Sequence, residues 1–169
     1  RYGFIWLSTS EGLNRFDGNS FKIYRHQPNN PHSLKSNSVY CLYEDKKGNL
    51  WVGTEKGIAS YDADLDQFLH SISMEDGPVR SICEDTGGLL WFIFRDELYY
   101  YDPAAKKLFK KYIPGVAQVS VITSDPKGGV WAGAVEGAAV YIHHKNATIY
   151  PLLSRSQNSI EALSLTKNN

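Results

Sequence analysis

The sequence predicts an all-β chain built from a repeated antiparallel sheet of four short strands. Two observations lead to this prediction. Tryptophan recurs at nearly constant intervals, because Trp6, Trp51, Trp91 and Trp131 are separated by 45, 40 and 40 positions. Each interval also contains short apolar runs punctuated by glycine, aspartate and proline turns. A strand-rich repeat of about forty residues is typical of a β-propeller, in which each unit forms one blade.

The positions around each tryptophan repeat as well. Glycine lies three residues before it, at Gly3, Gly48, Gly88 and Gly128. Aspartate lies six residues before it in three units, at Asp45, Asp85 and Asp125. We expect the tryptophans to pack between blades and the glycines to give their turns backbone freedom. The aspartates should cap the same turns by accepting hydrogen bonds from neighbouring amides.

The first predicted blade covers residues 1–37 and lacks its inner strand. Its strands are expected at Arg1–Leu7, Leu13–Phe16 and Ser20–Tyr24, with an Asp-Gly turn before the last of them. The segment Arg25–Asn37 is rich in proline, asparagine and histidine, and it is predicted to form an exposed loop.

Three more blades are predicted, at residues 38–77, 78–117 and 118–158. Their innermost strands should begin near Val39, Val79 and Val119. Residues 159–169, beginning at Ser159, would supply the inner strand of a further blade. Open blade edges invite pairing, so we expect this last segment to pair with the strand of Trp6, within one chain or across two copies.

Composition narrows the classes of function. Eighteen basic residues balance eighteen acidic ones, which argues against a dedicated nucleic-acid surface. No apolar run approaches the roughly 18 residues that a membrane span needs, and no signal peptide is visible. We therefore expect no contact with nucleic acid or membrane from this part of the protein. The chain starts without methionine and ends within a repeat, so we interpret it as a piece of a longer protein.

No catalytic or metal-binding motif is specific here. The nucleophile elbow, the H-E-x-x-H zinc motif, the phosphate loop and C-x-x-C are all absent from the sequence. Asp62–Asp66 begins like a calcium loop but has Gln67 where glycine is required, so we expect a solvated turn. The pair His143-His144 lacks a third ligand nearby. We expect no catalytic residue, metal or cofactor.

The two cysteines lie on the first strands of their blades. Cys41 precedes its tryptophan by ten residues and Cys83 precedes its own by eight. The even difference places both on the same kind of blade face. Adjacent blades meet through unlike faces, so the sequence predicts no disulfide between them.

The segment Val39–Asp62, VYCLYEDKKGNLWVGTEKGIASYD, resembles the two-component regulator propeller repeat. The segment NRFDGNSFKIYRHQPNNPHSL is similar to the early blades of such proteins. The resemblance implies the periplasmic sensor region of a hybrid two-component system histidine kinase of Bacteroidetes, whose parent is anchored in the inner membrane. It also implies an oligosaccharide signal, a kinase in a separate domain, and contacts with the other blades and domains of the parent.

We expect a ligand to be bound by loops that emerge on one side of the blades. These are the turns between second and third strands, together with Arg25–Asn37. Their charged and imidazole side chains are Glu11, His26, His32, Glu55, Lys56, Arg95, Asp96 and Glu136. Such groups can form charge-assisted hydrogen bonds with sugar hydroxyls. Arg95 and Asp96 are the strongest candidates, because the third blade departs from the repeat there.

Two other functions are compatible with a propeller. Streptogramin lyases are propellers with a similar tryptophan-bearing repeat, and they would need a histidine and metal-binding acids at one end of the axis. The five histidines here share no repeated position. The remaining alternative is a protein-interaction scaffold.

Overall fold

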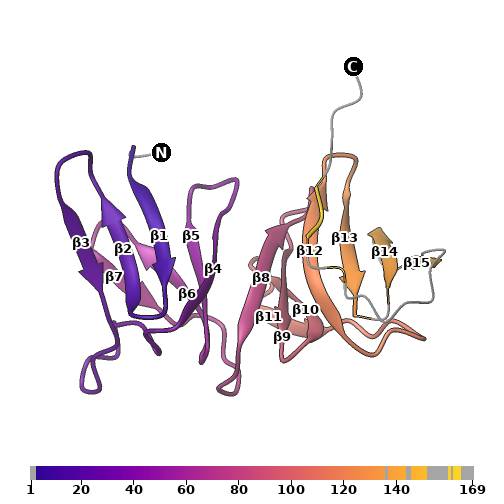
Figure 1. Ribbon diagram of the computed structural model, residues 1–169, viewed down its shortest axis with the longest axis horizontal. Helices are drawn as coiled ribbons and strands as arrows, with labels where there is room; N and C mark the ends of the chain where they lie inside the picture. Colours follow the sequence, from indigo (N-terminus) through magenta and orange to yellow (C-terminus); the bar gives the residue numbers. More distant parts are fainter. Residues whose placement is uncertain (1–2, 136, 144–145, 152–159, 161, 165–169) are drawn as a thin grey trace. The chain divides into compact units, whose positions relative to one another are not determined.

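The computed structural model describes residues 3–135, 137–143, 146–151, 160 and 162–164. This described part contains fifteen strands and no helix (Figure 1), which confirms the predicted all-β class. It accordingly holds no helix of the length and apolarity needed to cross a bilayer.

The strands form four antiparallel sheets, each in simple chain order. The first sheet has three strands: β1 (Ile5–Thr9), β2 (Gly12–Phe16) and β3 (Phe21–Tyr24). The second contains β4 (Val39–Glu44), β5 (Leu50–Thr54), β6 (Gly57–Asp62) and β7 (Gln67–Leu69). The third contains β8 (Val79–Glu84), β9 (Leu90–Phe94), β10 (Glu97–Asp102) and β11 (Lys107–Lys110). The fourth contains β12 (Val119–Asp125), β13 (Gly129–Ala134), β14 (Ala138–His143) and β15 (Asn146–Pro151).

Strands β4, β8 and β12 begin at Val39, Val79 and Val119, as predicted, and each lies at one edge of its sheet. The start of a fourth such strand, predicted at Ser159, lies outside the described residues. Ile160 is described, and it contacts the fourth sheet, where the Ser120 hydroxyl donates a hydrogen bond to its carbonyl oxygen. Pairing of residues 159–169 with the strand of Trp6 stays a prediction.

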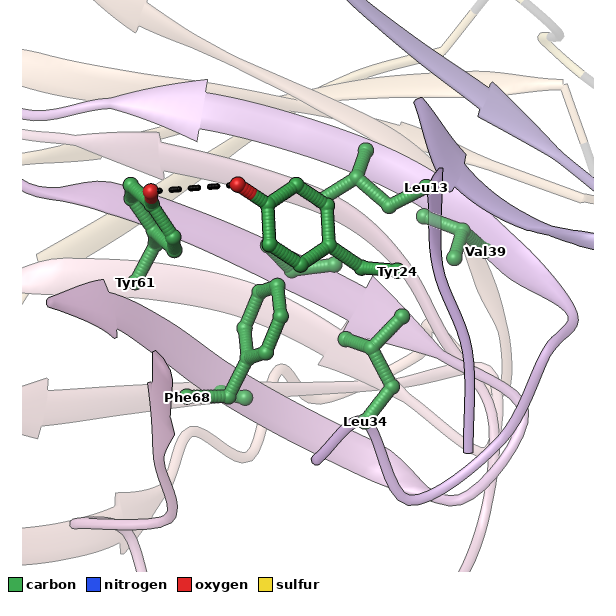
Figure 2. Packing of buried hydrophobic residues seen from close by; sticks show 8 residues of the cluster. Leu13, Tyr24, Leu34, Val39, Tyr61 and Phe68 are labelled. Carbon is green, nitrogen blue, oxygen red and sulfur yellow. Dashed lines mark hydrogen bonds between the residues drawn. The ribbon is translucent and has the colours of Figure 1, made fainter. Parts of the chain in front are cut away.

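The chain divides into two compact units, Arg1–Arg80 and Ser81–Asn169. In the first unit the core lies between the first and second sheets (Figure 2). Leu13 and Tyr24 from the first sheet pack there against Tyr61 and Phe68 from the second. Trp6 joins them, with its ring 4.9 Å from that of Tyr61 in an edge-to-face contact. This contact confirms the prediction that tryptophan packs between sheets, here for Trp6.

Leu34 changes the interpretation of Arg25–Asn37 as an exposed loop. Its side chain has no solvent exposure and lies in the core beside Phe68. The residues from Arg25 to His32 are exposed as predicted, whereas Ser33 and Ser36 are buried. The loop is therefore anchored at its C-terminal half, because one apolar residue within a polar sequence is drawn into the core.

In the second unit, every residue of β9 is buried, including Ile93 and Phe94. These two residues occupy the repeat positions of Gly53 and Thr54 in the second sheet. The third sheet therefore has large apolar side chains at positions where the second sheet has small residues. The departure of the third blade from the repeat is therefore a packing change as well as a change in its turn.

The predicted turn-capping aspartates are confirmed. Oδ1 of Asp45 accepts hydrogen bonds from the amides of Lys47, at 3.0 Å, and Asn49, at 2.8 Å. Asp85 and Asp125 bond the amides of Gly87 and Lys127 in the same way.

Candidate functional site

The segment Arg25–Asn37 is held in place by hydrogen bonds along its length. His26 Nδ1 donates to the carbonyl oxygen of Leu34 at 2.7 Å, and the His26 amide donates to Asn37 Oδ1 at 2.7 Å. The Gln27 amide donates to Ser33 Oγ at 2.9 Å. The two ends of the segment are thus tied together, and its exposed tip is presented on a fixed base.

The same segment is bonded to the second sheet. The amide of Phe68, in β7, donates to the carbonyl oxygen of His32 at 2.9 Å. His70 Nε2 donates to the carbonyl oxygen of Ser33, also at 2.9 Å. Burial lowers the pKa of His70, so its ring is neutral and keeps this donor arrangement at neutral pH. The loop therefore spans from β3 of the first sheet to β7 of the second.

Two clefts flank this loop. The first, which we call the polar cleft, has a volume of about 400 Å³ and lies between β3, the loop and the β6–β7 turn. Its lining is Lys22, Ile23, Tyr24, Arg25, Gln27, Asn30, His32, Ser33, Leu65, Asp66, Gln67 and Phe68. The second, of about 420 Å³, is lined by the prolines of the loop together with His26 and His70.

Asp66 forms the charged wall of the polar cleft. Its carboxylate accepts hydrogen bonds from the hydroxyls of Tyr24, at 2.6 Å, and Tyr61, and it forms an ion pair with Lys22. Burial by itself raises the pKa of Asp66, but hydrogen bonds from Lys22, Tyr24 and Tyr61 outweigh it and lower that pKa to about 2. Asp66 is therefore an anion whose charge Lys22 balances.

The two tyrosines of this network remain protonated donors. Burial first, and then the hydrogen bond to Asp66, raises the pKa of both Tyr24 and Tyr61. Arg15 completes the network, because its guanidinium donates to the Tyr61 hydroxyl at 2.8 Å and lies 3.5 Å from Asp66. These groups bind β2 and β3 of the first sheet to the β6–β7 turn of the second, and they give the cleft a rigid wall.

The segment Arg25–Asn37 contributes amides, one guanidinium and one imidazole to the lining of the polar cleft. Asn30 Nδ2 donates to Gln27 Oε1 at 2.9 Å, which fixes the orientation of both amides. Arg25 Nε donates to the carbonyl oxygen of Glu11 at 3.0 Å. Amides, a guanidinium and the His32 imidazole beside a rigid wall can hydrogen-bond a hydroxyl-rich ligand.

The structure brings together only part of the predicted site of the first unit. His32 lines the polar cleft and His26 lines the second cleft. Glu55 contacts the end of the loop, where the Ser36 hydroxyl donates to its Oε2 at 3.3 Å. Lys56 is absent from the lining of both clefts, and its described hydrogen bond joins its amide to Thr54 Oγ1 at 3.2 Å.

Sequence reasoning missed several lining residues of the polar cleft, namely Lys22, Gln27, Asn30, Asp66 and Gln67. The prediction considered charged and imidazole groups on one set of loops, whereas these residues come from the end of β3, the β6–β7 turn and the amides of the long loop. The concentration of asparagine and glutamine at residues 27–30 was the one signal available in the sequence.

In the second unit, Arg95 and Asp96 form a strained two-residue turn between β9 and β10. Phe94 pairs with Glu97, and the two central residues have φ values of 51° and 62°. A hairpin of this geometry favours Asn-Gly, because left-handed backbone is unfavourable for other residues. At the turn between β5 and β6, Gly57 takes the left-handed conformation instead, with φ of 112°.

The two residues of the predicted pair have different described contacts. Asp96 lines a cleft of about 180 Å³ together with Glu97, Lys111 and Tyr112, and its carbonyl oxygen accepts the Val119 amide at 2.8 Å. Arg95 is absent from that lining; its guanidinium lies 5.1 Å from the centroid of the Phe94 ring. The Tyr112 side chain is 74% exposed and offers an aromatic surface to the cleft. Glu136, the remaining predicted residue, lies outside the described residues.

The described residues contain no group of three or more histidine, cysteine, aspartate or glutamate side chains that could hold a metal ion. The Asp62–Asp66 turn is closed by hydrogen bonds from the amides of Asp64 and Leu65 to Asp62 Oδ1. His144 lies outside the described part.

These blades define a β-propeller fold, and solved structures confirm it. The chain superposes on the extracellular domain of a putative hybrid two component system from B. thetaiotaomicron with a TM-score of 0.75 and 23% identity. This match covers 87% of the chain and 21% of that domain. Virginiamycin B lyase from Staphylococcus aureus gives a TM-score of 0.69 at 16% identity, over 90% of this chain and 53% of the lyase.

Sequence comparison then identifies the repeat. Residues 33–56 match the family model described as two component regulator propeller, which confirms the predicted resemblance. Over 34 residues the chain is 47% identical to Histidine kinase P4 from Formosa agariphila, which is 20% of this chain and 2% of that protein. The chain thus spans about a fifth of the solved extracellular domain and far less of the kinase.

Proposed function

We propose that this chain is part of the extracytoplasmic ligand-sensing propeller of a hybrid two-component sensor histidine kinase. The observation that carries the proposal is the two component regulator propeller repeat at residues 33–56. The likeness to an extracellular domain of a putative hybrid two component system supports the same assignment. In this proposal the chain lies in the periplasm, its parent is anchored in the inner membrane, and the kinase occupies a separate domain.

The ligand class proposed is an oligosaccharide, and the polar cleft supports it. The cleft is lined by the amides of Gln27, Asn30 and Gln67 together with Tyr24 and the paired charges of Lys22 and Asp66. Sugar hydroxyls both donate and accept, and these groups offer both functions within one cleft of about 400 Å³. Asp96 and the exposed ring of Tyr112 provide a second candidate surface in the other unit. The chain itself acts as a binding module and not as an enzyme.

Titration calorimetry of the purified chain with a panel of oligosaccharides tests this function. Gln67→Ala and Asn30→Ala should each weaken binding by about fivefold, because one hydrogen bond to a neutral partner is worth about 1 kcal/mol. Gln118→Ala is the matched control, since Gln118 is exposed in the second unit and its described hydrogen bond is made by its backbone carbonyl oxygen, which accepts the Val135 amide.

The double variant Arg95→Ala/Asp96→Ala is titrated in parallel to compare the two surfaces. Loss of affinity there, with unchanged affinity in Gln67→Ala, would move the site to the second unit. A panel in which no oligosaccharide binds the chain or its full-length parent would remove the proposed ligand class.

The likeness to virginiamycin B lyase favours a second candidate, a lyase of the streptogramin type. An assay for cleavage of a streptogramin antibiotic, with and without a divalent metal ion, separates this enzyme from a sensor. Turnover that needs the metal would establish the lyase. A scaffold that binds proteins would be indicated by neither cleavage nor oligosaccharide binding.

A further inference from the structure

The polar cleft carries more positive than negative charge. Its lining contains two cations, Lys22 and Arg25, and one carboxylate, Asp66. Lys22 is paired with that carboxylate, and Arg15, which is not part of the lining, lies 3.5 Å from it. Asp66 is therefore shared by two cations, and no anion of the lining remains to balance the charge of Arg25.

The guanidinium of Arg25 is held by one of its three nitrogens. Nε donates to the carbonyl oxygen of Glu11 in the β1–β2 turn at 3.0 Å. The stem of Arg25 passes so close to Gly12 that a Cβ atom there would lie 3.2 Å from Arg25 Cγ. Within the described residues, Arg25 forms no ion pair and its two terminal nitrogens have no hydrogen-bond partner. A guanidinium anchored at Nε keeps these two nitrogens for a ligand with paired oxygens.

His32 adds a further donor to the same lining. Its backbone is fixed on both sides, because its amide donates to Asn30 Oδ1 at 2.9 Å and its carbonyl oxygen accepts the Phe68 amide at 2.9 Å. An imidazole ring always carries at least one N–H donor. The cleft thus combines an unbalanced guanidinium, an imidazole on a fixed backbone and side-chain amides, which together favour a ligand that carries negative charge as well as hydroxyls.

We propose that the polar cleft binds an acidic oligosaccharide, with a carboxylate or sulfate ester of one sugar on the terminal nitrogens of Arg25. The sugar hydroxyls then bond the amides of the cleft, such as that of Gln67. The inference rests on the proposed function and narrows its ligand class. Carboxylates pair with a guanidinium through two parallel hydrogen bonds, and a sulfate ester offers oxygens in the same arrangement. A neutral sugar would displace water from Arg25 without supplying an anion in return.

Titration calorimetry of the full-length protein compares acidic oligosaccharides with neutral counterparts of the same length. The pairs are trigalacturonate with its methyl ester, and a monosulfated with an unsulfated galactose trisaccharide. The acidic member should bind at least about tenfold more tightly, because hydrogen bonds between charged groups are about twice as strong as neutral ones. The pair that shows this preference distinguishes a carboxylate from a sulfate ester. Inorganic sulfate, titrated alone, should bind more weakly than either acidic sugar, because it cannot reach the amides at the same time.

Arg25→Gln removes the charge and should abolish the preference, weakening the acidic sugar about tenfold and the neutral one by no more than about twofold. Arg25→Lys keeps the charge without the fork and should give an intermediate affinity. Lys127→Gln is the matched control, since Lys127 is exposed in the second unit and its described hydrogen bond is made by its amide. It also removes one positive charge and should leave both affinities unchanged. Arg25 is exposed, so its variants should melt like the unsubstituted protein.

The outcomes separate this inference from the proposed function. Neutral sugars that bind as tightly as acidic ones, or unchanged affinity in Arg25→Gln, would overturn the inference and leave the sensing function standing. Inorganic sulfate that binds as tightly as the acidic sugars would also overturn it, because a free anion would then be the ligand. Absence of binding by every oligosaccharide, acidic or neutral, would remove the proposed ligand class and this inference together.

Discussion

The indole N–H of Trp51 donates a 2.9 Å hydrogen bond to Oδ2 of Asp45, six residues earlier in the chain. The same bond joins Trp91 to Asp85 at 2.8 Å and Trp131 to Asp125 at 3.1 Å. The aspartate therefore has two roles, since its other oxygen caps the turn that precedes the tryptophan strand. Two of the positions that define the repeat are in contact, which explains their constant spacing.

Replacing Asp45 by alanine should destabilise the protein by about 1–3 kcal/mol, because the turn amides and the Trp51 indole all lose their acceptor. Trp51→Phe removes only the indole donor and some buried volume. Urea denaturation of both single variants and the double variant gives their coupling energy, expected near 1 kcal/mol for groups in direct contact. Asp64→Ala, in an exposed turn, is the control and should change little. Strictly additive effects would show that the bond contributes nothing.

Asp66 should make stability depend on acid pH. Its folded pKa is lowered to about 2 from an ordinary 3.8, because hydrogen bonds outweigh the effect of burial. The unfolded chain therefore binds the proton more readily than the folded protein. This contribution is complete above pH 3.8 and is lost as pH falls through that value toward 2.

The measurement is the free energy of unfolding in urea at several pH values between 7 and 2. Asp66→Asn keeps the shape of the side chain but cannot titrate, so its loss of stability over this range should be shallower than that of the unsubstituted protein. Asp64→Asn serves as control and should follow the unsubstituted curve. Parallel curves for Asp66→Asn and the unsubstituted chain would contradict the assignment.

Asp96→Gly should stabilise the second unit by about 1 kcal/mol, because glycine adopts the left-handed conformation without the usual penalty. Lys56 occupies the matching turn position of the second sheet and has no positive φ. Lys56→Gly should therefore lower stability slightly, through the entropy of the unfolded chain. Thermal unfolding of Asp96→Gly and Lys56→Gly, each compared with the unsubstituted protein, tests these two predictions. A loss of stability in Asp96→Gly would mean that the aspartate side chain contributes more than the strain costs.

Cys41 and Cys83 should resist both alkylation and oxidation in the folded protein. Burial raises the pKa of the Cys41 thiol to about 12 and also raises the pKa of Cys83, so the reactive thiolate is scarce at neutral pH. Both thiols are free in the structure. Intact mass under non-reducing conditions should show two thiols per chain, and iodoacetamide should modify them only after denaturation. A mass two hydrogens lower would reveal a disulfide.

The four sheets could be predicted because the glycine, aspartate and tryptophan of each repeat recur at nearly constant spacing in the sequence. The edge strands begin at Val39, Val79 and Val119 as expected. Each of these valines lies at the same distance before the tryptophan of its sheet. The burial of Leu34 and the network around Asp66 could not be predicted in the same way. They depend on contacts between residues far apart in the sequence, such as Arg15 with Tyr61, 46 residues apart. No periodic pattern in the sequence predicts these contacts.

The turn at Arg95-Asp96 shows a third kind of limit. The sequence predicts a departure from the repeat there, but it does not predict that both central residues of the turn have positive φ values.

The bond between Asp45 and Trp51 has a consequence for how the chain acquires its structure. It closes a loop of only six residues, so forming it costs little chain entropy and does not require distant parts of the sequence to meet. The same bond forms independently in three sheets, at Asp45, Asp85 and Asp125. Each can serve as a local starting point, and folding can then spread from any one to its neighbours as in other repeat arrays. A substitution in one closure should slow that route while the others continue to operate.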